Sequence, residues 1–437
     1  MNNSFKNLLI GIFLVGVRFN ASAATTPPNI IFILADDYGV GEVSAYGADN
    51  YKTPHIDQLA RGGIRFTHAY TPSLCGPSRA TILTGRYLFR TGATNQDATG
   101  QMSSAEIMIP KMLKAAGYVT TMIGKWGQLP LGSAEFGFDE HLKFTGSGAY
   151  WNSQDKGKNY QLNGVKKPLA DKLYLPDVMH DYLVDFMTRH RDRPFYAYYS
   201  MSHVHSEILP TPDSAPDSKD HYADNIRYMD KLIGKLVAEL DRLKLRENTL
   251  IVFVGDNGTG GNYADEGTIQ GRRLSGEKGS MLEGGANVPL IVNWPGKTPA
   301  GKVSADLIDS TDFFPTFAEL AGAKPPADTV MDGRSQAPQW QGRKGQPREW
   351  IFIQLARKWY VRDARWKLNQ EGALFDMSQA PFAETQVTGS NDNATIAARK
   401  KLQAALDKLN PAGGFLDDGD GSGRHANRRE DRKKKDR

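Results

Sequence analysis

The sequence predicts an α/β protein with a large mixed, mostly parallel sheet sandwiched by helices, followed by a smaller antiparallel sheet with one helix. Short continuous apolar runs are typical of strands buried on both faces. Four such runs occur, at residues 29–35, 195–200, 249–255 and 288–293. Helical segments separate these runs, and strands that alternate with helices favour a layered α/β core.

Three helices are predicted between the strands. The first begins at Thr53-Pro54, since threonine caps a helix and proline suits its first turn, and it ends at Gly62-Gly63. The second covers 109–116 and ends at Gly117. The third, at 220–243, is long and has its apolar side chains on one face.

The pattern changes after residue 342. Short, partly alternating segments separated by turns predict an antiparallel sheet, and a helix follows at 394–409. The segments lie at 350–355, 359–362, 366–370 and 373–376. We therefore divide the chain into an N-terminal segment (1–23), a large domain (24–342), a C-terminal α+β subdomain (346–410) and a disordered basic tail (411–437).

The N-terminal segment has the features of an export signal. Lys6 precedes an apolar run at 8–17, and Ala21-Ser22-Ala23 provides small residues for cleavage. The run is too short for a stable membrane anchor, and no second run of spanning length follows. We expect a periplasmic or secreted protein without a membrane span.

The basic charge of the chain is concentrated in its tail. From Arg424 onward there are eight basic and three acidic residues, so this segment has a net charge of +5. The formal net charge of all 437 residues is also +5. The rest of the chain is formally neutral, so we expect no nucleic-acid partner.

Acidic pairs follow two of the predicted strands. Asp36-Asp37 comes after the first, and Asp256-Asn257 after the run at 249–255. Ligands of open α/β sheets gather at the carboxyl ends of strands, and oxygen ligands suit Ca²⁺ or Mg²⁺. The same residues also favour plain turns, so both interpretations stay open at this point.

Cys75 is the one cysteine of the sequence, so no intramolecular disulfide forms. Pro77 suits the first turn of a helix and Gly85 its end, which places Cys75 at a helix N-terminus with Arg79 one turn further on. The helix dipole favours negative charge there. The spacing fits either a reactive group or a small buried turn residue.

The segment Cys75-Gly76-Pro77-Ser78-Arg79, with Thr84-Gly85-Arg86 behind it, resembles the signature of the type I sulfatases of the alkaline phosphatase superfamily. Further matches follow in the family's order, and the resemblance covers most of the chain. These are Asp36-Asp37, residues 53–60, Gly124-Lys125-Trp126, residues 255–258, and Lys278 ahead of Glu283-Gly284-Gly285.

The resemblance implies hydrolysis of sulfate monoesters. Cys75 would be converted to formylglycine by a maturation enzyme, and one hydroxyl of the hydrated aldehyde would attack sulfur to give a covalent sulfate. The second hydroxyl would expel that sulfate. One Ca²⁺, ahead of Mg²⁺, would be held by Asp36, Asp37, Asp256 and Asn257 and would contact residue 75.

The resemblance also assigns the remaining site residues. Arg79 would hold residue 75, and Lys125 and Lys278 would bind the sulfate oxygens. His205 would protonate the leaving oxygen, with His203 as the competing candidate.

One position departs from the family. The usual Gly-Lys-Trp-His-Leu-Gly is here Gly124-Lys125-Trp126-Gly127-Gln128-Leu129, so the histidine assigned to sulfate release is missing. Gly127 is no base, and the Gln128 amide can only form hydrogen bonds.

We expect a sulfated carbohydrate as the substrate, with specificity in the irregular segments 144–172 and 262–275. Two alternatives remain. The first alternative is a phosphoester hydrolase of the same superfamily. Phosphatases of this fold, however, use Ser or Thr at the position of Cys75. The second alternative is a catalytically silent relative that only binds sulfated glycans. The missing histidine favours this interpretation.

Overall fold

The computed structural model describes residues 27–389 and 392–417. The predicted export signal and the tail beyond residue 417 lie outside these ranges. Among the described residues, no helix combines the length and the apolar character needed to cross a membrane.

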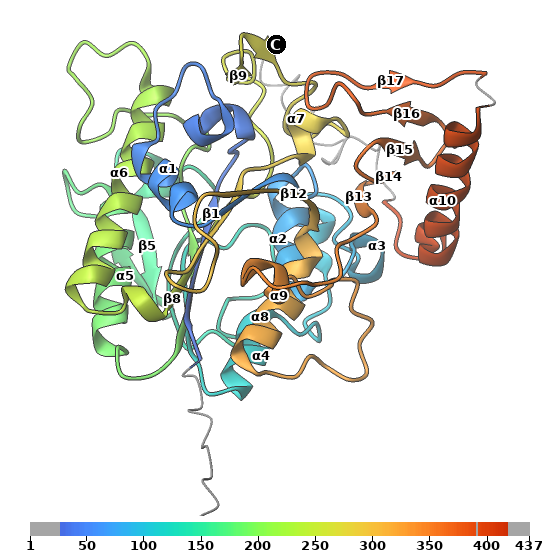
Figure 1. Cartoon of the computed structure of the whole chain (residues 1–437). Helices are drawn as coiled ribbons and strands as arrows, with labels where there is room; N and C mark the ends of the chain where they lie inside the picture. Colours follow the sequence, from blue (N-terminus) through green and yellow to red (C-terminus); the bar gives the residue numbers. More distant parts are fainter. Residues whose placement is uncertain (1–26, 390–391, 418–437) are drawn as a thin grey trace, which may run out of the picture.

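A large sheet forms the centre of the protein (Figure 1). Within the described residues its strand order is β12 (Lys302–Asp309), β2 (Ile64–Tyr70), β11 (Leu290–Asn293), β8 (Thr249–Gly255), β1 (Asn29–Ala35), β7 (Phe195–Ser200), β3 (Val119–Lys125), β4 (Glu140–Phe144), β5 (Asn159–Leu162) and β6 (Val165–Pro168). Strands β8, β1, β7, β3 and β4 run parallel to one another, which confirms the mostly parallel sheet.

Helices cover both faces of this sheet (Figure 1). One face packs against α1 (Pro54–Arg61), α5 (Leu175–Arg189) and α6 (His221–Arg242). The other packs against α2 (Cys75–Thr84), α4 (Ile109–Ala115) and α8 (Phe313–Ala321). The short helices α3 (Leu88–Thr91), α7 (Glu283–Ala286) and α9 (Ala337–Trp340) lie in connecting segments.

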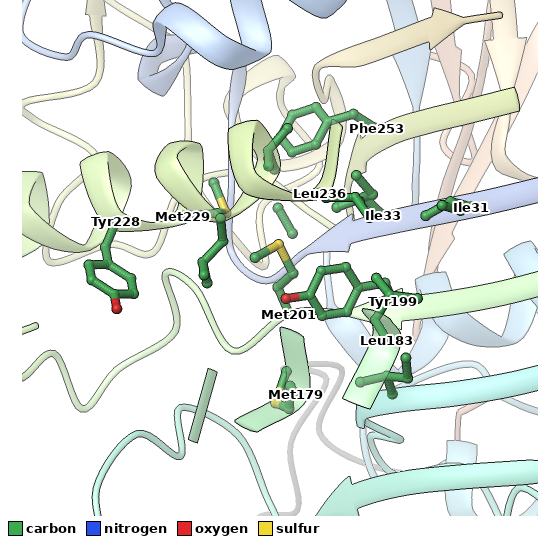
Figure 2. Packing of buried hydrophobic residues seen from close by; sticks show 14 of the residues in the cluster. Ile31, Ile33, Met179, Leu183, Tyr199, Met201, Tyr228, Met229, Leu236 and Phe253 are labelled. Carbon is green, nitrogen blue, oxygen red and sulfur yellow. The ribbon is translucent and has the colours of Figure 1, made fainter. Parts of the chain in front are cut away.

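Strand β1 supplies both layers of the core because successive side chains of a strand point to opposite faces. Ile31 and Ile33 face α5 and α6, where Figure 2 shows them packed near Leu236 and Tyr199. Ile30, Phe32 and Leu34 point to the other face, toward α2 and α8. All side chains of β1 are buried, as the continuous apolar run predicts.

A second sheet follows near the C-terminus, again as predicted. Within the described residues its antiparallel strands are β13 (Ile351–Leu355), β14 (Lys358–Arg362), β15 (Trp366–Asn369), β16 (Leu374–Asp376) and β17 (Thr385–Gln386). Helix α10 (Asn393–Leu409) covers one face through Leu402 and Leu406, which pack with Phe352 and Leu368. A two-stranded hairpin, β9 (Thr268–Ile269) and β10 (Arg272–Arg273), lies apart from both sheets.

The structure differs from the predictions in detail. The run at 288–293 forms β11, which is antiparallel to both neighbours because the chain between β8 and β11 stays at the carboxyl end of β8. Strand β17 was not predicted, since two exposed residues carry no apolar pattern. Residues 411–417, assigned to the disordered tail, continue the fold: the Phe415 N–H donates to the Phe89 carbonyl.

Leu236 tests the packing of α6 on the sheet. It is fully buried, so Leu236→Ala should lower the free energy of unfolding by about 2–5 kcal/mol through lost apolar contact and a residual cavity. Urea titration measures this loss. Lys235→Ala, at an exposed neighbouring position of the same helix, should change stability by less than about 0.5 kcal/mol. Equal effects of the two substitutions would contradict this packing.

Candidate active site

The two acidic pairs meet at the carboxyl ends of β1 and β8. These strands are parallel neighbours in which Ala35 pairs with Gly255, so the residues that follow them lie side by side. The Asp37 N–H donates to Asp256 Oδ1 at 3.0 Å, and Asn257 Nδ2 donates to Asp37 Oδ1 at 3.0 Å. The structure therefore brings the predicted metal ligands of both pairs together.

Cys75 lies beside these carboxylates. It is the first residue of α2, as predicted, and it is buried. One ligand atom from each of Asp36, Cys75 and Asp256 lies within 4.8 Å of the other two. The helix N-terminus thus presents residue 75 to the acidic cluster.

Three cations neutralise the cluster. Arg79 Nη2 donates to Asp256 Oδ2 at 2.7 Å, and its Nη1 donates to the Lys125 carbonyl at 2.9 Å. Lys125, the last residue of β3, places Nζ 2.7 and 2.8 Å from the two Asp36 oxygens. Lys278 Nζ lies 2.7 Å from Asp37 Oδ2. The predicted sulfate-binding and residue-75-holding side chains are therefore all at the site, each on a carboxylate.

Burial and neighbouring charges shift the pKa values of these groups in opposite directions. Burial, together with the charge of Asp36, raises the pKa of Asp256 to about 6. Burial also acts to raise the pKa of Asp37, but the nearby Lys278 outweighs it and holds that pKa well below its usual range. Burial acts to lower the pKa of Lys278, and the Asp37 carboxylate overcomes it, so that pKa is raised.

The donor set fits a hard divalent cation. Three carboxylates and the Asn257 amide converge, and among the described residues Asn257 Oδ1 is buried without a hydrogen-bond partner. An orphaned buried acceptor beside carboxylates is a suitable ligand for Ca²⁺ or Mg²⁺, whereas Zn²⁺ prefers nitrogen and sulfur. Asp36, Asp37, Asp256 and Asn257 are the residues that would hold the ion.

The two candidate histidines occupy different environments. His205 Nε2 lies 3.7 Å from Asp37 Oδ2, and its side chain is 22% exposed. His203 is fully buried, and its Nε2 lies 3.1 Å from the Tyr174 hydroxyl. Burial lowers the pKa of His205 to about 4 and that of His203 to about 3. Of the two, His205 borders the acidic cluster.

Gln96 is a site residue that the sequence did not indicate. Its Nε2 lies 3.3 Å from Cys75 Sγ, and its Oε1 accepts the Gly76 N–H at 3.1 Å. It lies in an irregular loop 21 residues after Cys75, so neither periodicity nor spacing identifies it. Ser200, at the end of β7, was also missed and accepts a hydrogen bond from Arg79.

The chain belongs to the sulfatase family: residues 28–323 match the family described as Sulfatase. Residues 276–411 match the C-terminal region of N-sulphoglucosamine sulphohydrolase. The protein is therefore a sulfuric ester hydrolase of the alkaline phosphatase-like fold, as its sequence resemblance implies.

Characterised sulfatases resemble the chain over most of its length. Human arylsulfatase A is 33% identical over 76% of this chain and 71% of its own. The N-acetylgalactosamine-6-sulfatase of Canis lupus familiaris is 33% identical over 76% of this chain and 69% of its own. Among solved structures, Ps i-CgsB in complex with k-i-k-neocarrahexaose has a TM-score of 0.74 and 28% identity, covering 88% of this chain and 93% of that one.

A buried glutamate supports the loop after β8. Glu42 is fully buried, and its Oε1 accepts hydrogen bonds from Thr259 and, at 3.3 Å, from Tyr222. Burial raises the pKa of Glu42 to about 7 from an ordinary value of about 4.5, although the hydrogen bond from Thr259 opposes the shift. The folded protein therefore binds this proton more tightly than the unfolded chain does.

Glu42→Gln tests this raised pKa. The stabilising effect of the bound proton is complete below about pH 4.5 and is lost as the pH rises through about 7. The neutral variant does not suffer this loss, so its stability relative to the wild type should increase between pH 5 and 8 by on the order of 2–3 kcal/mol. Urea titrations across this range measure the difference. The exposed Glu319→Gln should show no such trend, and a flat difference for Glu42→Gln would show that the pKa of Glu42 is not raised.

Proposed function

We propose that the protein hydrolyses sulfate monoesters of carbohydrates with formylglycine, formed from Cys75, as its nucleophile. The observation that carries the proposal is the position of Cys75 at the N-terminus of α2, within 4.8 Å of Asp36 and Asp256. A mature side chain there lies at the N–H end of a helix, beside carboxylates that pair with the buried cations Arg79 and Lys125.

The side chains of the site divide the reaction between them. One hydroxyl of hydrated residue 75 gives its proton to solvent and attacks sulfur, and the bond from sulfur to the leaving oxygen breaks. His205 gives that oxygen a proton, since the negative charge of the bound ester favours the protonated imidazole against the burial that lowers its pKa in the free site. Lys125 and Lys278 bind sulfate oxygens as fixed positive charges. The second hydroxyl then gives its proton to solvent, the bond from carbon to the sulfate oxygen breaks, and the aldehyde returns as sulfate leaves.

Ca²⁺ would supply charge neutralisation at the sulfate oxygen and at the nucleophile. Arg79 has a different role. Its guanidinium donates hydrogen bonds to three acceptors and so fixes Asp256 relative to β3 and β7. The buried carboxylates therefore keep their geometry as ligands.

Carbohydrate is the substrate class best supported by the relatives. Ps i-CgsB was solved with a neocarrahexaose, and the canine relative is an N-acetylgalactosamine-6-sulfatase. The segments proposed to select the sugar contain the β5–β6 hairpin and the β9–β10 hairpin. The predicted export signal is the basis for proposing action in the periplasm or outside the cell, after maturation by a formylglycine-generating enzyme.

The first test combines peptide mass spectrometry of residue 75 with a sulfate-release assay. Protein from a host that contains the maturation enzyme should carry an aldehyde at residue 75 and release sulfate from a general aryl sulfate. Cys75→Ala should release none because the nucleophile is absent. An aryl phosphate, assayed in parallel, should be a poor substrate.

Unmodified cysteine, in a host that converts a control sulfatase, would overturn the proposal. So would binding of sulfated glycans without any release by aldehyde-bearing protein, which is the behaviour of a silent relative. Gly127 is the observation that favours this second possibility, since it stands where the family has a histidine.

Ca²⁺ binding can be tested without activity. Ca²⁺ at about 100 times its dissociation constant should stabilise the protein by about 2.7 kcal/mol, and EDTA should reverse this. Asp37→Asn should lose most of the stabilisation, because a ligand charge is removed, whereas the exposed Asp217→Asn should retain it. Thermal unfolding with Ca²⁺ or Mg²⁺ provides the measurement; a full response of Asp37→Asn would exclude Asp37 as a ligand.

The loss of activity on removing His205 should depend on the leaving group. A sugar alkoxide needs a proton when it leaves, so His205→Ala should lower kcat on a sugar sulfate by about 10²–10⁴-fold. An aryl sulfate with an acidic phenol needs little protonation and should lose far less. His221→Ala, at a partly exposed histidine of α6, provides the control. Equal losses on both substrates would assign His205 a role other than proton donation.

A further inference from the structure

Two glutamine side chains lie near the Cys75-Gly76 segment at the start of α2. Gln96 contacts the backbone of Gly76 and the side chain of Cys75 with the two ends of one amide. Because a backbone N–H can only donate, the amide atom that faces Gly76 must be Oε1. The donor end, Nε2, therefore lies 3.3 Å from Cys75 Sγ, and Oε1 lies 3.6 Å from the same sulfur.

Gln128 approaches the same place from the turn after β3. Its Oε1 is buried and, among the described residues, has no hydrogen-bond partner. A Cβ on Gly76 would lie 3.0 Å from Gln96 Oε1 and 3.4 Å from Gln128 Oε1. The glycine of the Cys75-Gly76-Pro77 sequence thus leaves room for the oxygens of both amides. Gln96 also offers its Nε2 to residue 75, and Gln128 Oε1 remains an acceptor without a partner among the described residues.

This pair suits the hydrated form of residue 75. The Sγ atom of Cys75 stands where maturation places the aldehyde oxygen. When water adds to the aldehyde, its oxygen bonds to carbon and its proton goes to the former carbonyl oxygen, which leaves two hydroxyl groups. Each hydroxyl accepts and donates hydrogen bonds, so one donor and one acceptor beside residue 75 can bind both hydroxyls.

We propose that Gln96 and Gln128 are positioning residues that stabilise and orient the hydrate of residue 75. Gln96 Nε2 donates to one hydroxyl oxygen, and Gln128 Oε1 accepts the hydrogen of the other. Both amides keep all their protons throughout. This inference rests on the proposed function, since it requires the aldehyde, and it assigns a role to the region from which the family histidine is missing.

Gln96→Glu separates positioning from folding. The carboxylate keeps an acceptor for the Gly76 N–H but turns an oxygen, in place of a donor, toward residue 75. Gln101→Glu is the matched control, because it makes the same change at an exposed glutamine of the neighbouring 3-10 turn Ala98–Gln101. Gln128→Leu removes the acceptor without adding charge and serves as the second variant.

The measurement is the rate at which residue 75 reacts with methoxyamine, divided by the aldehyde content from mass spectrometry. Methoxyamine reacts with the free aldehyde, so a smaller hydrated fraction means faster labelling. Gln128→Leu should label about fivefold faster than wild type, because the hydrate loses an acceptor. Gln96→Glu should label about fivefold slower, because a hydroxyl of the hydrate can donate to the carboxylate whereas the aldehyde oxygen cannot. In both variants kcat on an aryl sulfate should fall, since the hydroxyls are no longer oriented by the two amides, with a smaller change in KM. Gln101→Glu should match the wild type in both.

The outcomes for the inference and for the proposed function are distinguishable. Labelling of both variants at the wild-type rate, in protein that hydrolyses the aryl sulfate, would overturn the inference and leave the function intact. Aldehyde-bearing wild type that releases no sulfate would overturn the function, while the labelling rates still decide the role of the amides. Absence of the aldehyde from every protein would overturn both.

Discussion

The active site depends on the neutralisation of three buried carboxylates at the ends of β1 and β8. An isolated buried carboxylate is costly, and truncating one partner of a buried ion pair is strongly destabilising. Here Asp36, Asp37 and Asp256 pair with Lys125, Lys278 and Arg79, which come from β3, the loop before α7 and α2, respectively. The secondary structure around the site is arranged so that each cation reaches its carboxylate.

This arrangement also prepares the site for its ligands. A divalent cation at the proposed ligands would compete with Lys125 and Lys278 for the same oxygens of Asp36 and Asp37, so binding of the metal would be linked to release of the lysine charges. A sulfate ester brings negative charge that those lysines can then bind. The strongest acceptors of the free site are thus also the proposed metal ligands, and its cations are the proposed substrate ligands.

Position within the sheet explains why these residues meet. Strand β1 lies between β8 and β7, and parallel neighbours end at the same edge. Residues that follow such strands must therefore be close, which is why Asp36 and Asp256 could be predicted from apolar runs and their acidic endings. The family motifs supplied Lys125 and Lys278, which no local pattern distinguishes from surface lysines.

Other parts could not be predicted because their placement depends on tertiary contacts. Gln96 reaches Cys75 through an irregular loop, and its position depends on how that loop packs against α2. Strand β17 and residues 411–417 lack apolar periodicity and are ordered by what they contact, as the bond between Phe415 and Phe89 shows. Sequence patterns indicate which side chains of a single helix or strand are buried. The positions of these residues depend instead on contacts with other elements, which such patterns do not contain.

The same reasoning applies to the boundary predicted at 342–346, which separates the large domain from the C-terminal sheet. The second family match begins at residue 276, well before that boundary, and so includes Lys278. In the structure the segment around Lys278 is tied to the C-terminal sheet: Arg362 of β14 forms a buried ion pair with Glu283 at 2.5 Å. Lys367 of β15 donates to the Met281 carbonyl at 2.8 Å.

These ties pass directly to the active site. The Lys278 N–H donates to the Thr259 carbonyl at 2.9 Å, and the Gly279 N–H donates to the Ser73 carbonyl at 2.8 Å. One short segment therefore connects the C-terminal sheet, the loop after Asn257 and the chain that leads into Cys75. The C-terminal sheet supports the position of Lys278, a proposed substrate ligand, so the site depends on contacts that cross the boundary suggested by composition alone.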